Sequence, residues 1–155
     1  MTARLDIFNL SPQAYKGLGA AKNALQEASL PRELLELVYL RVSQINGCAF
    51  CIDMHSRDLM NHGVGFDKIV LVPVWQEAEA LFSDKERAAL AWAETVTRVA
   101  ETGVPDADYA AAAAEFSDAE LSDLTYAIGL MNAFNRFGVS FRVRPAATVA
   151  AEADV

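Results

Sequence analysis

Apolar residues along most of this chain recur every three or four positions, which is the spacing of an amphipathic α-helix. The alternating pattern that is typical of β-strands is scarce, so an all-α fold is predicted. Capping residues, prolines and glycines mark where the helices begin and end. They place helices at about residues 12–28, 31–45, 48–62, 84–101 and 118–142, with a short alanine-rich helix after Pro105. The apolar run 69–72 is assigned to a further helix, with Asp67 as its cap.

Two segments carry the same helix-start signal. Residues 83–86 and 117–120 are both S-x-x-E capping boxes, and each has a phenylalanine just before the serine. They predict the two longest helices, and Pro145 is expected to end the second of them. We therefore predict a single helical domain, residues 1–145, followed by a flexible C-terminal tail, residues 146–155.

Composition narrows the class of protein further. Apolar residues make up 53% of the chain, against roughly 45–50% in an average soluble protein. No apolar run approaches the roughly 18 residues of a membrane span, and the first ten residues lack the core of a signal peptide. We expect a cytoplasmic protein with no membrane segment, whose surplus of apolar residues is buried between identical subunits. The net charge of −8 repels phosphate backbones, so nucleic acid is not an expected partner.

The candidate chemistry lies near the end of the first third of the chain. Its only two cysteines, Cys48 and Cys51, are three residues apart, and His55 follows four residues later. Positions three and four apart share one face of a helix, so two thiols and an imidazole converge. A structural disulfide is not expected in a cytosolic protein, so the cysteines are predicted to serve either through their reactivity or as metal ligands. Glu36 would face the thiols if the preceding helix turns back at residues 46–47, and would otherwise lie on the solvent side.

The residues by themselves leave open which thiol reacts first. Cys48 lies at the predicted helix start, where the helix dipole favours a thiolate. Cys51 is about 6 Å along the helix from His55, close enough for the imidazole to act as its base. In either case an oxidised cysteine beside a second thiol condenses to a disulfide, and a reductant then restores the dithiol.

A zinc site is one alternative, because a single helical stripe carries four candidate ligands: Cys48, Cys51, His55 and His62. On a straight helix these side chains spread over about 20 Å, far beyond one tetrahedral shell, so structural zinc is not expected. The thiol chemistry itself requires no metal or organic cofactor. His62 is instead placed at the C-terminal end of its helix. The large aromatic residues are expected in the core or at a subunit interface, namely Trp75, Trp92 and Phe134, with Tyr126 in the core.

The candidate site residues and several segments around them resemble those of the AhpD-like superfamily, which includes the alkylhydroperoxidase AhpD and the carboxymuconolactone decarboxylases. The likeness covers about residues 14–144. It is carried by Glu36, Cys51, His55 and Gly63 and by the segments 40–48, 83–94 and 131–136.

The resemblance implies an all-helical bundle that assembles into homo-trimers or homo-hexamers. It also implies reduction of hydroperoxides at the expense of an external thiol or dithiol. The matching proton relay consists of Glu36, Cys48, Cys51 and His55. In that family the second cysteine attacks the peroxide, which implies Cys51 as the nucleophile and Cys48 as the resolving thiol.

One position departs from AhpD proper, which carries another histidine just before the second cysteine. This chain has Phe50 there, and a phenyl ring does not relay a proton. The decarboxylase branch lacks this CxxC, so decarboxylation is the less expected activity. A thiol–disulfide sensor or interaction protein is a further alternative, because it would react with peroxide but turn over poorly.

Overall fold

The computed structural model describes residues 2–153, which contain only helices and the segments that join them. The order along the chain is α1 (Ile7–Leu10), α2 (Pro12–Gln26), α3 (Arg32–Ile45), α4 (Ala49–Asn61), α5 (Phe66–Leu71), the 3₁₀ segment η1 (Val72–Leu81), α6 (Asp84–Thr97), α7 (Val99–Thr102), α8 (Asp106–Glu115), α9 (Asp118–Phe141) and α10 (Ala146–Ala153). This confirms the prediction of an all-α fold.

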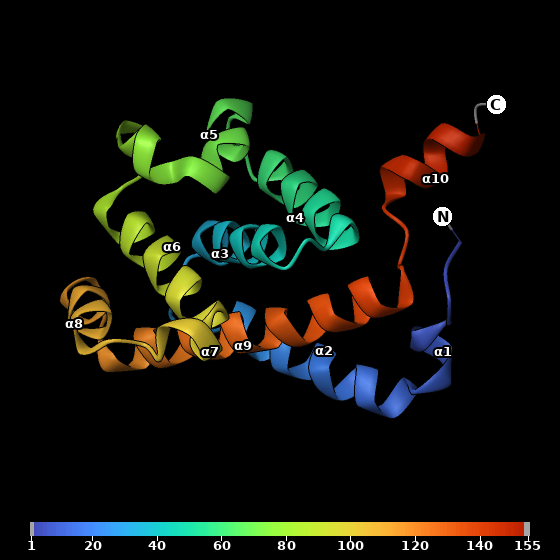
Figure 1. The fold of residues 1–155 in the computed structure, drawn as a ribbon, viewed down its shortest axis with the longest axis horizontal. Helices are drawn as coiled ribbons and strands as arrows, with labels where there is room; N and C mark the ends of the chain where they lie inside the picture. Colours follow the sequence, from blue (N-terminus) through green and yellow to red (C-terminus); the bar gives the residue numbers. More distant parts are fainter. Residues whose placement is uncertain (1, 154–155) are drawn as a thin grey trace.

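Helix α3 is the buried centre of the molecule. It packs against α4, α6 and α9, and Figure 1 shows it between α4 above and the long helix α9 below. Nine of its fourteen residues are buried, because a helix that is covered on all sides must be apolar on all sides. Glu36 and Ser43 are the polar exceptions among the nine.

Local sequence signals account for most of the helix ends. Pro12 occupies the first turn of α2, where its missing N–H costs nothing. Gly47 has φ +66°, a left-handed conformation that only glycine adopts easily, and this turn lets α4 fold back against α3. Both capping boxes form, since the Ser83 and Ser117 hydroxyls accept hydrogen bonds from backbone N–H groups three residues on.

Three helix boundaries differ from the prediction. The helix expected over residues 84–101 is interrupted at Arg98, and the Thr102 hydroxyl donates to the Thr95 carbonyl at 2.9 Å, which satisfies a carbonyl left free by the break. Gly65, not Asp67, is the N-terminal cap of α5. The long helix α9 ends at Phe141, four residues before Pro145, because Arg142 adopts a left-handed conformation with φ +56°.

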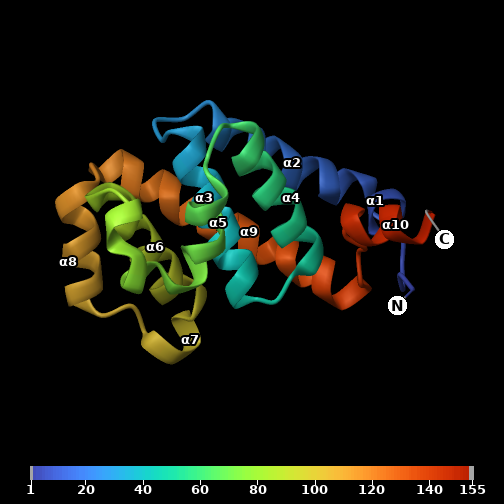
Figure 2. The same cartoon turned by 90° about the horizontal axis from the view of Figure 1, so that it is seen from above.

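The C-terminal residues form the helix α10, which has no buried residue. Figure 2 shows it beside the N-terminal segment at one end of the molecule. The Arg144 side chain pairs with Glu152 at 2.6 Å, and the Ala147 N–H donates to the Asp53 carboxylate at 3.2 Å. Flexibility of residues 146–155 stays a prediction, and its last two residues lie outside the described ones. Within the described residues no helix is both long and apolar enough to span a membrane.

Candidate functional site

The two cysteines meet at the N-terminal end of α4. Cys48 is the capping residue, with an extended backbone, and Cys51 lies in the first helical turn. Both are free thiols and both are buried. The Cys51 thiol and its backbone N–H lie close enough to the Cys48 sulfur to affect its pKa, although the Cys48 side chain makes no capping hydrogen bond to α4. The sulfur of Cys48 therefore occupies the position in which a helix N-terminus stabilises negative charge.

These contacts split the pKa values of the two thiols. The hydrogen bond from the Cys51 thiol, together with backbone N–H groups and Asn135, lowers the pKa of Cys48 to about 7 against the opposing effect of burial. The same shared hydrogen bond and burial raise the pKa of Cys51 well above its usual range. When the pair has lost one proton, the remaining proton is held between the two sulfurs and the negative charge resides mainly on Cys48.

Helix α9 covers the thiols with residues to which the sequence analysis assigned no chemistry. A side-chain carbon added at Gly138 would lie 2.7 Å from the Cys48 sulfur and 3.7 Å from the Cys51 sulfur, so only glycine fits there without displacing them. The buried Asn135 donates to the Ser43 hydroxyl at 3.0 Å and accepts from Asn46 at 3.0 Å. The one sequence signal for this network was the polar residue Asn135 on an otherwise apolar helix.

Glu36 and His55 form the second part of the site. They come from α3 and α4, and the His55 Nδ1–H donates to the Glu36 carboxylate over 2.6 Å. The two side chains are 1% and 0% exposed, so the solvent-facing alternative for Glu36 is wrong. The carboxylate holds the imidazole in the tautomer with the proton on Nδ1, which leaves Nε2 free to take up a proton.

The second ring nitrogen of His55 makes no such contact among the described residues. His55 Nε2 is buried and has no hydrogen-bond partner within residues 2–153, and the Tyr39 ring packs against the imidazole at 5.2 Å between centroids. Burial, with a smaller effect of the Glu36 charge, raises the pKa of Tyr39 above its ordinary value, so its hydroxyl stays protonated. His55 is one helical turn from Cys51 on the same face of α4, and a hydrogen bond between them is absent in the described residues.

The structure separates the four ligands of the zinc alternative. His62 caps the exposed C-terminal end of α4, where its Nδ1–H donates to the Asp58 carbonyl at 2.6 Å. The side chains that do converge are Glu36, His55 and Asp58, whose ligand atoms all lie within 4.8 Å of one another. Neither cysteine belongs to this group, so the thiols and these three oxygen and nitrogen donors are separate sets.

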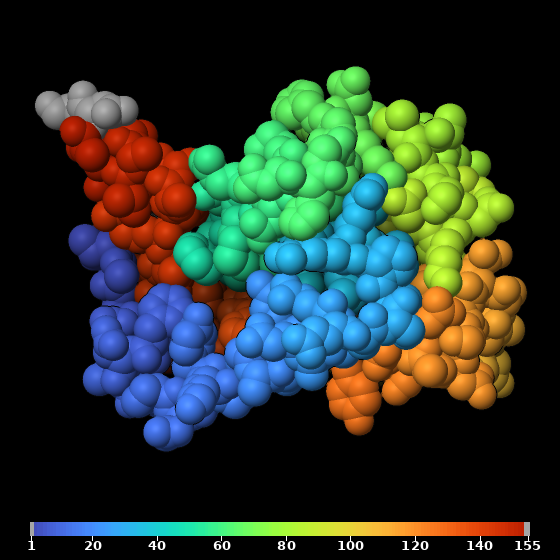
Figure 3. All heavy atoms as spheres, turned by 180° about the vertical axis from the view of Figure 1, so that it is seen from behind, coloured from blue at the N-terminus to red at the C-terminus, as the bar shows by residue number. Residues whose placement is uncertain are grey.

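A cavity of about 320 Å³ reaches the thiol pair from outside. Cys51 lines it and Cys48 does not, and Phe50 and Gly138 lie in the same wall. Helices α2, α4 and α9 contribute most of its surface. Figure 3 shows the corresponding hollow between α2 and α4, with α9 at its floor. Access from this cavity therefore favours Cys51, whereas the local electrostatics favour charge on Cys48.

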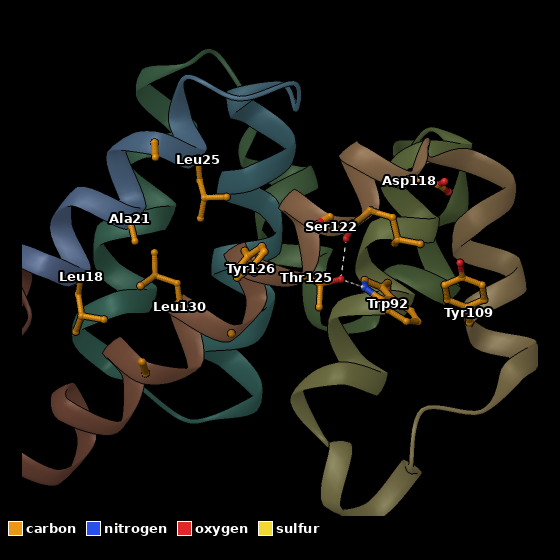
Figure 4. Close-up of a pocket in the computed structure, with 14 residues that line it drawn as sticks. Leu18, Ala21, Leu25, Trp92, Tyr109, Asp118, Ser122, Thr125, Tyr126 and Leu130 are labelled. Atoms are coloured by element: carbon orange, nitrogen blue, oxygen red, sulfur yellow. Dashed lines mark hydrogen bonds between the residues drawn. The ribbon is translucent and has the colours of Figure 1, made fainter.

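A larger apolar groove, about 820 Å³, lies elsewhere on α9, between α2, α6 and α8. Figure 4 shows Leu18, Leu25 and Leu130 on one side of it and Trp92 on the other, with the Trp92 indole N–H donating to Thr125. Tyr126 stands in this groove and is 70% exposed, so its predicted place in the core is wrong. Trp75 and Trp92 are buried, as predicted for core residues.

Comparison with known proteins places this architecture in a family. The sequence profile of the carboxymuconolactone decarboxylase family matches residues 12–95. The chain is 32% identical over 146 residues to the uncharacterized protein YdfG of Bacillus subtilis, covering 94% of this chain and 99% of that protein. A segment of 47 residues is 40% identical to alkyl hydroperoxide reductase AhpD of Rhizorhabdus wittichii, covering 30% of this chain and 27% of that protein.

One solved structure shares nearly the whole fold. It is a protein of unknown function from Agrobacterium tumefaciens, ATU0492, that has been suggested to be the antioxidant defence protein AhpD. Its sequence is 40% identical, the TM-score is 0.89, and the match covers 93% of this chain and 98% of that chain. The residues that the family profile matches include α3 and α4, the helices that carry Glu36, the CxxC and His55. The chain therefore belongs to the carboxymuconolactone decarboxylase family and has the AhpD-like helical fold.

Proposed function

We propose that this protein is a thiol-dependent hydroperoxide reductase that acts in antioxidant defence. The observation that carries the proposal is a pair of neighbouring thiols, one of which lines a cavity while the other has a pKa lowered to about 7. A buried Glu36–His55 pair lies on the adjoining helices. A thiolate is the reactive form of cysteine, and a neighbouring thiol is what makes its oxidation reversible. Membership of the AhpD-like fold and the suggested antioxidant role of the Agrobacterium protein point the same way.

In the proposed reaction Cys51 is the nucleophile, because it is the thiol that the cavity reaches. Its proton passes to Cys48 or to His55 Nε2, and the Cys51 thiolate attacks the terminal oxygen of the hydroperoxide. The O–O bond breaks, Cys51 becomes a sulfenic acid, and the departing alkoxide takes up a proton to give the alcohol. The peroxide is thereby reduced by two electrons and the sulfur oxidised by two.

The second step closes a disulfide. The Cys48 sulfur attacks the Cys51 sulfenic sulfur, the S–S bond forms, and the hydroxyl group leaves as water after taking up a proton. His55, held by Glu36, is the group we assign to manage these protons. An external dithiol then returns two electrons and two protons by thiol–disulfide exchange. Phe50 occupies the position of the extra AhpD histidine, so this relay is shorter.

Cysteine variants test the assignment directly. Cys48→Ser should be oxidised once by an organic hydroperoxide and keep a sulfenic acid on Cys51, which dimedone traps and mass spectrometry locates. Cys51→Ser should show no peroxide-dependent modification at the wild-type rate. Full peroxide reduction by Cys51→Ser would reject the proposed nucleophile, and a wild-type disulfide that forms but is not cycled by any dithiol would favour a redox sensor.

We further propose a homo-oligomer. The apolar groove that carries Tyr126 is the surface we assign to contact with a second copy, because an exposed apolar surface of this kind marks an interaction site. Cytoplasmic location stays a prediction from the sequence, as do the trimeric or hexameric state and the identity of the thiol reductant.

A further inference from the structure

We infer that the cavity beside Cys51 binds the hydroperoxide of a free long-chain fatty acid, with Lys22 binding its carboxylate. The inference rests on the proposed function, and it adds the class of substrate and a residue that selects it. It depends on three properties of the cavity: its volume, the character of its walls, and the charge at Lys22.

The cavity is too large for hydrogen peroxide alone. Its volume of about 320 Å³ is roughly ten times the share of one water molecule in the liquid, about 30 Å³. Organic ligands occupy pockets of about 300–1,000 Å³. An organic hydroperoxide would fill this space, whereas hydrogen peroxide would leave most of it to water.

The walls favour an aliphatic chain. Apolar side chains from three helices, α1, α4 and α9, line the cavity with Cys51, and they are Ile7, Phe8, Met54, Met131, Phe134 and Phe137. A second apolar cavity of about 270 Å³ shares Ile7, Tyr15 and Phe137 with the first and continues along α2 toward Ser11. The methionines are flexible and fit chains of varying shape. The two cavities therefore adjoin, and together they offer more room for a chain than the cavity at Cys51 alone.

Lys22 is the one charged residue among those that line the cavity at Cys51. It is half-buried, and it makes no ion pair with any residue from 2 to 153. A cation that is partly removed from water and has no anionic partner favours binding of an anion. In a protein of net charge −8 this local positive charge gives an anionic substrate a specific place to bind.

The order of these features along α2 defines the class of substrate. Lys22 lies toward the C-terminal end of α2 and the second cavity lies toward its N-terminal end. A carboxylate at Lys22 with the chain extended toward Ser11 brings the middle of the chain to the cavity that Cys51 lines. Hydroperoxides of unsaturated fatty acids carry the –OOH group in mid-chain, which fits this arrangement, whereas a small hydroperoxide leaves Lys22 unused.

Binding is tested without the reaction, by titrating unoxidised linoleate into the reduced protein in a calorimeter below its micellar concentration. Lys22→Met should weaken linoleate binding about tenfold, and Lys22→Arg, which keeps the charge, should retain it. Lys16→Met is the matched control, because Lys16 is exposed on the same helix and does not line the cavity. Methyl linoleate should bind the wild type and Lys22→Met equally. Unchanged linoleate affinity in Lys22→Met, or equal affinity of the wild type for acid and ester, would overturn the inference.

Reactivity is tested separately with the 13-hydroperoxide of linoleic acid, its methyl ester and tert-butyl hydroperoxide. The wild type should show a kcat/KM about tenfold higher for the acid than for the ester, and Lys22→Met should lose that preference through KM alone. Equal losses for all three peroxides would contradict a carboxylate site. If linoleate binds tightly but its hydroperoxide leaves the thiols intact, the binding site stands and the proposed reductase activity is rejected.

Discussion

Two cavities lie along the same helix, α9, and they differ in almost every property that matters for chemistry. The groove of about 820 Å³ between α2, α6 and α8 is walled by leucines, alanines and aromatic rings, with Asp118 as its one charged residue. The cavity of about 320 Å³ holds Cys51 in its wall and Lys22 at its side. The larger cavity has room but no reactive group. Volume therefore does not locate the site; a reactive side chain with a perturbed pKa does.

The two cavities differ because different residues lie beneath their surfaces. Cys51 lies in the first turn of α4, and near it are a second thiol and the Glu36–His55 pair, whose side chains are buried. In such surroundings a hydrogen bond or a helix dipole acts on charge more strongly than in solvent. Behind the larger groove lies the apolar core around α3 and α9, which offers only packing.

Removing the charge that orients His55 should have the largest effect. Glu36→Gln keeps the shape of the side chain but weakens its hold on the imidazole Nδ1–H, so the rate of disulfide formation with an organic hydroperoxide should fall about 100-fold. The measurement is loss of free thiols by stopped flow. Glu33→Gln is the control, because Glu33 lies on the same helix and is half exposed, at 47%. Equal rates in the two variants would remove Glu36 from the relay.

A methyl group at Gly138 should disturb the thiols, since it would lie 2.7 Å from the Cys48 sulfur. Gly138→Ala should displace that sulfur from Cys51, raise the pKa of Cys48 toward its ordinary value, and slow thiol oxidation at pH 7 more than tenfold. The pKa is read from thiolate absorbance near 240 nm. Gly129→Ala is the matched control, because Gly129 lies on the same helix beside the larger groove with nothing within 4 Å of the added carbon. A wild-type thiolate titration in Gly138→Ala would contradict the close packing.

The rate should follow ionisation of the thiol pair. Because the pKa of Cys48 is lowered to about 7, the singly ionised pair is nearly fully formed at pH 8 and falls to about one-tenth at pH 6. The observed rate of oxidation should therefore decline about tenfold from pH 8 to pH 6 and level off above pH 8. The apparent pKa belongs to the pair, since proton transfer between the sulfurs does not change their total charge. A midpoint near 9 would mean that neither thiol is activated.

A change in the larger groove should leave the chemistry untouched. Tyr126→Glu places a charge on a residue that is 70% exposed at this groove, so it should dissociate the proposed homo-oligomer, as measured by light scattering. The single-turnover rate of thiol oxidation should stay within about twofold of the wild type. A large loss of that rate would show that the groove contributes to the site, and a wild-type oligomer would place the subunit interface elsewhere.

Much of this protein follows from local sequence. The structure confirms the helix ends predicted from the two capping boxes, Pro12 and Gly47. Each of these signals acts on backbone groups no more than four residues away in the sequence. The CxxC and His55 were found for the same reason, since three- and four-residue spacings on one helix are readable in the chain. The break of the helix at Arg98 was missed, because no proline or glycine marks it and the β-branched residues beside it lower the helical propensity only modestly.

Only the tertiary structure decided how distant residues meet. The sequence allowed Glu36 to face solvent or the thiols, and packing of α3 against α4 and α9 enclosed it. Gly138 and Asn135 lie about 90 residues from the CxxC in the sequence, so no local pattern predicts that α9 covers the two sulfurs. The cavity at Cys51 and the charge of Lys22 beside it likewise depend on how α2 lies across α9. Local capping and periodicity are short-range properties of the chain, whereas burial, pKa values and cavities depend on which helices pack together.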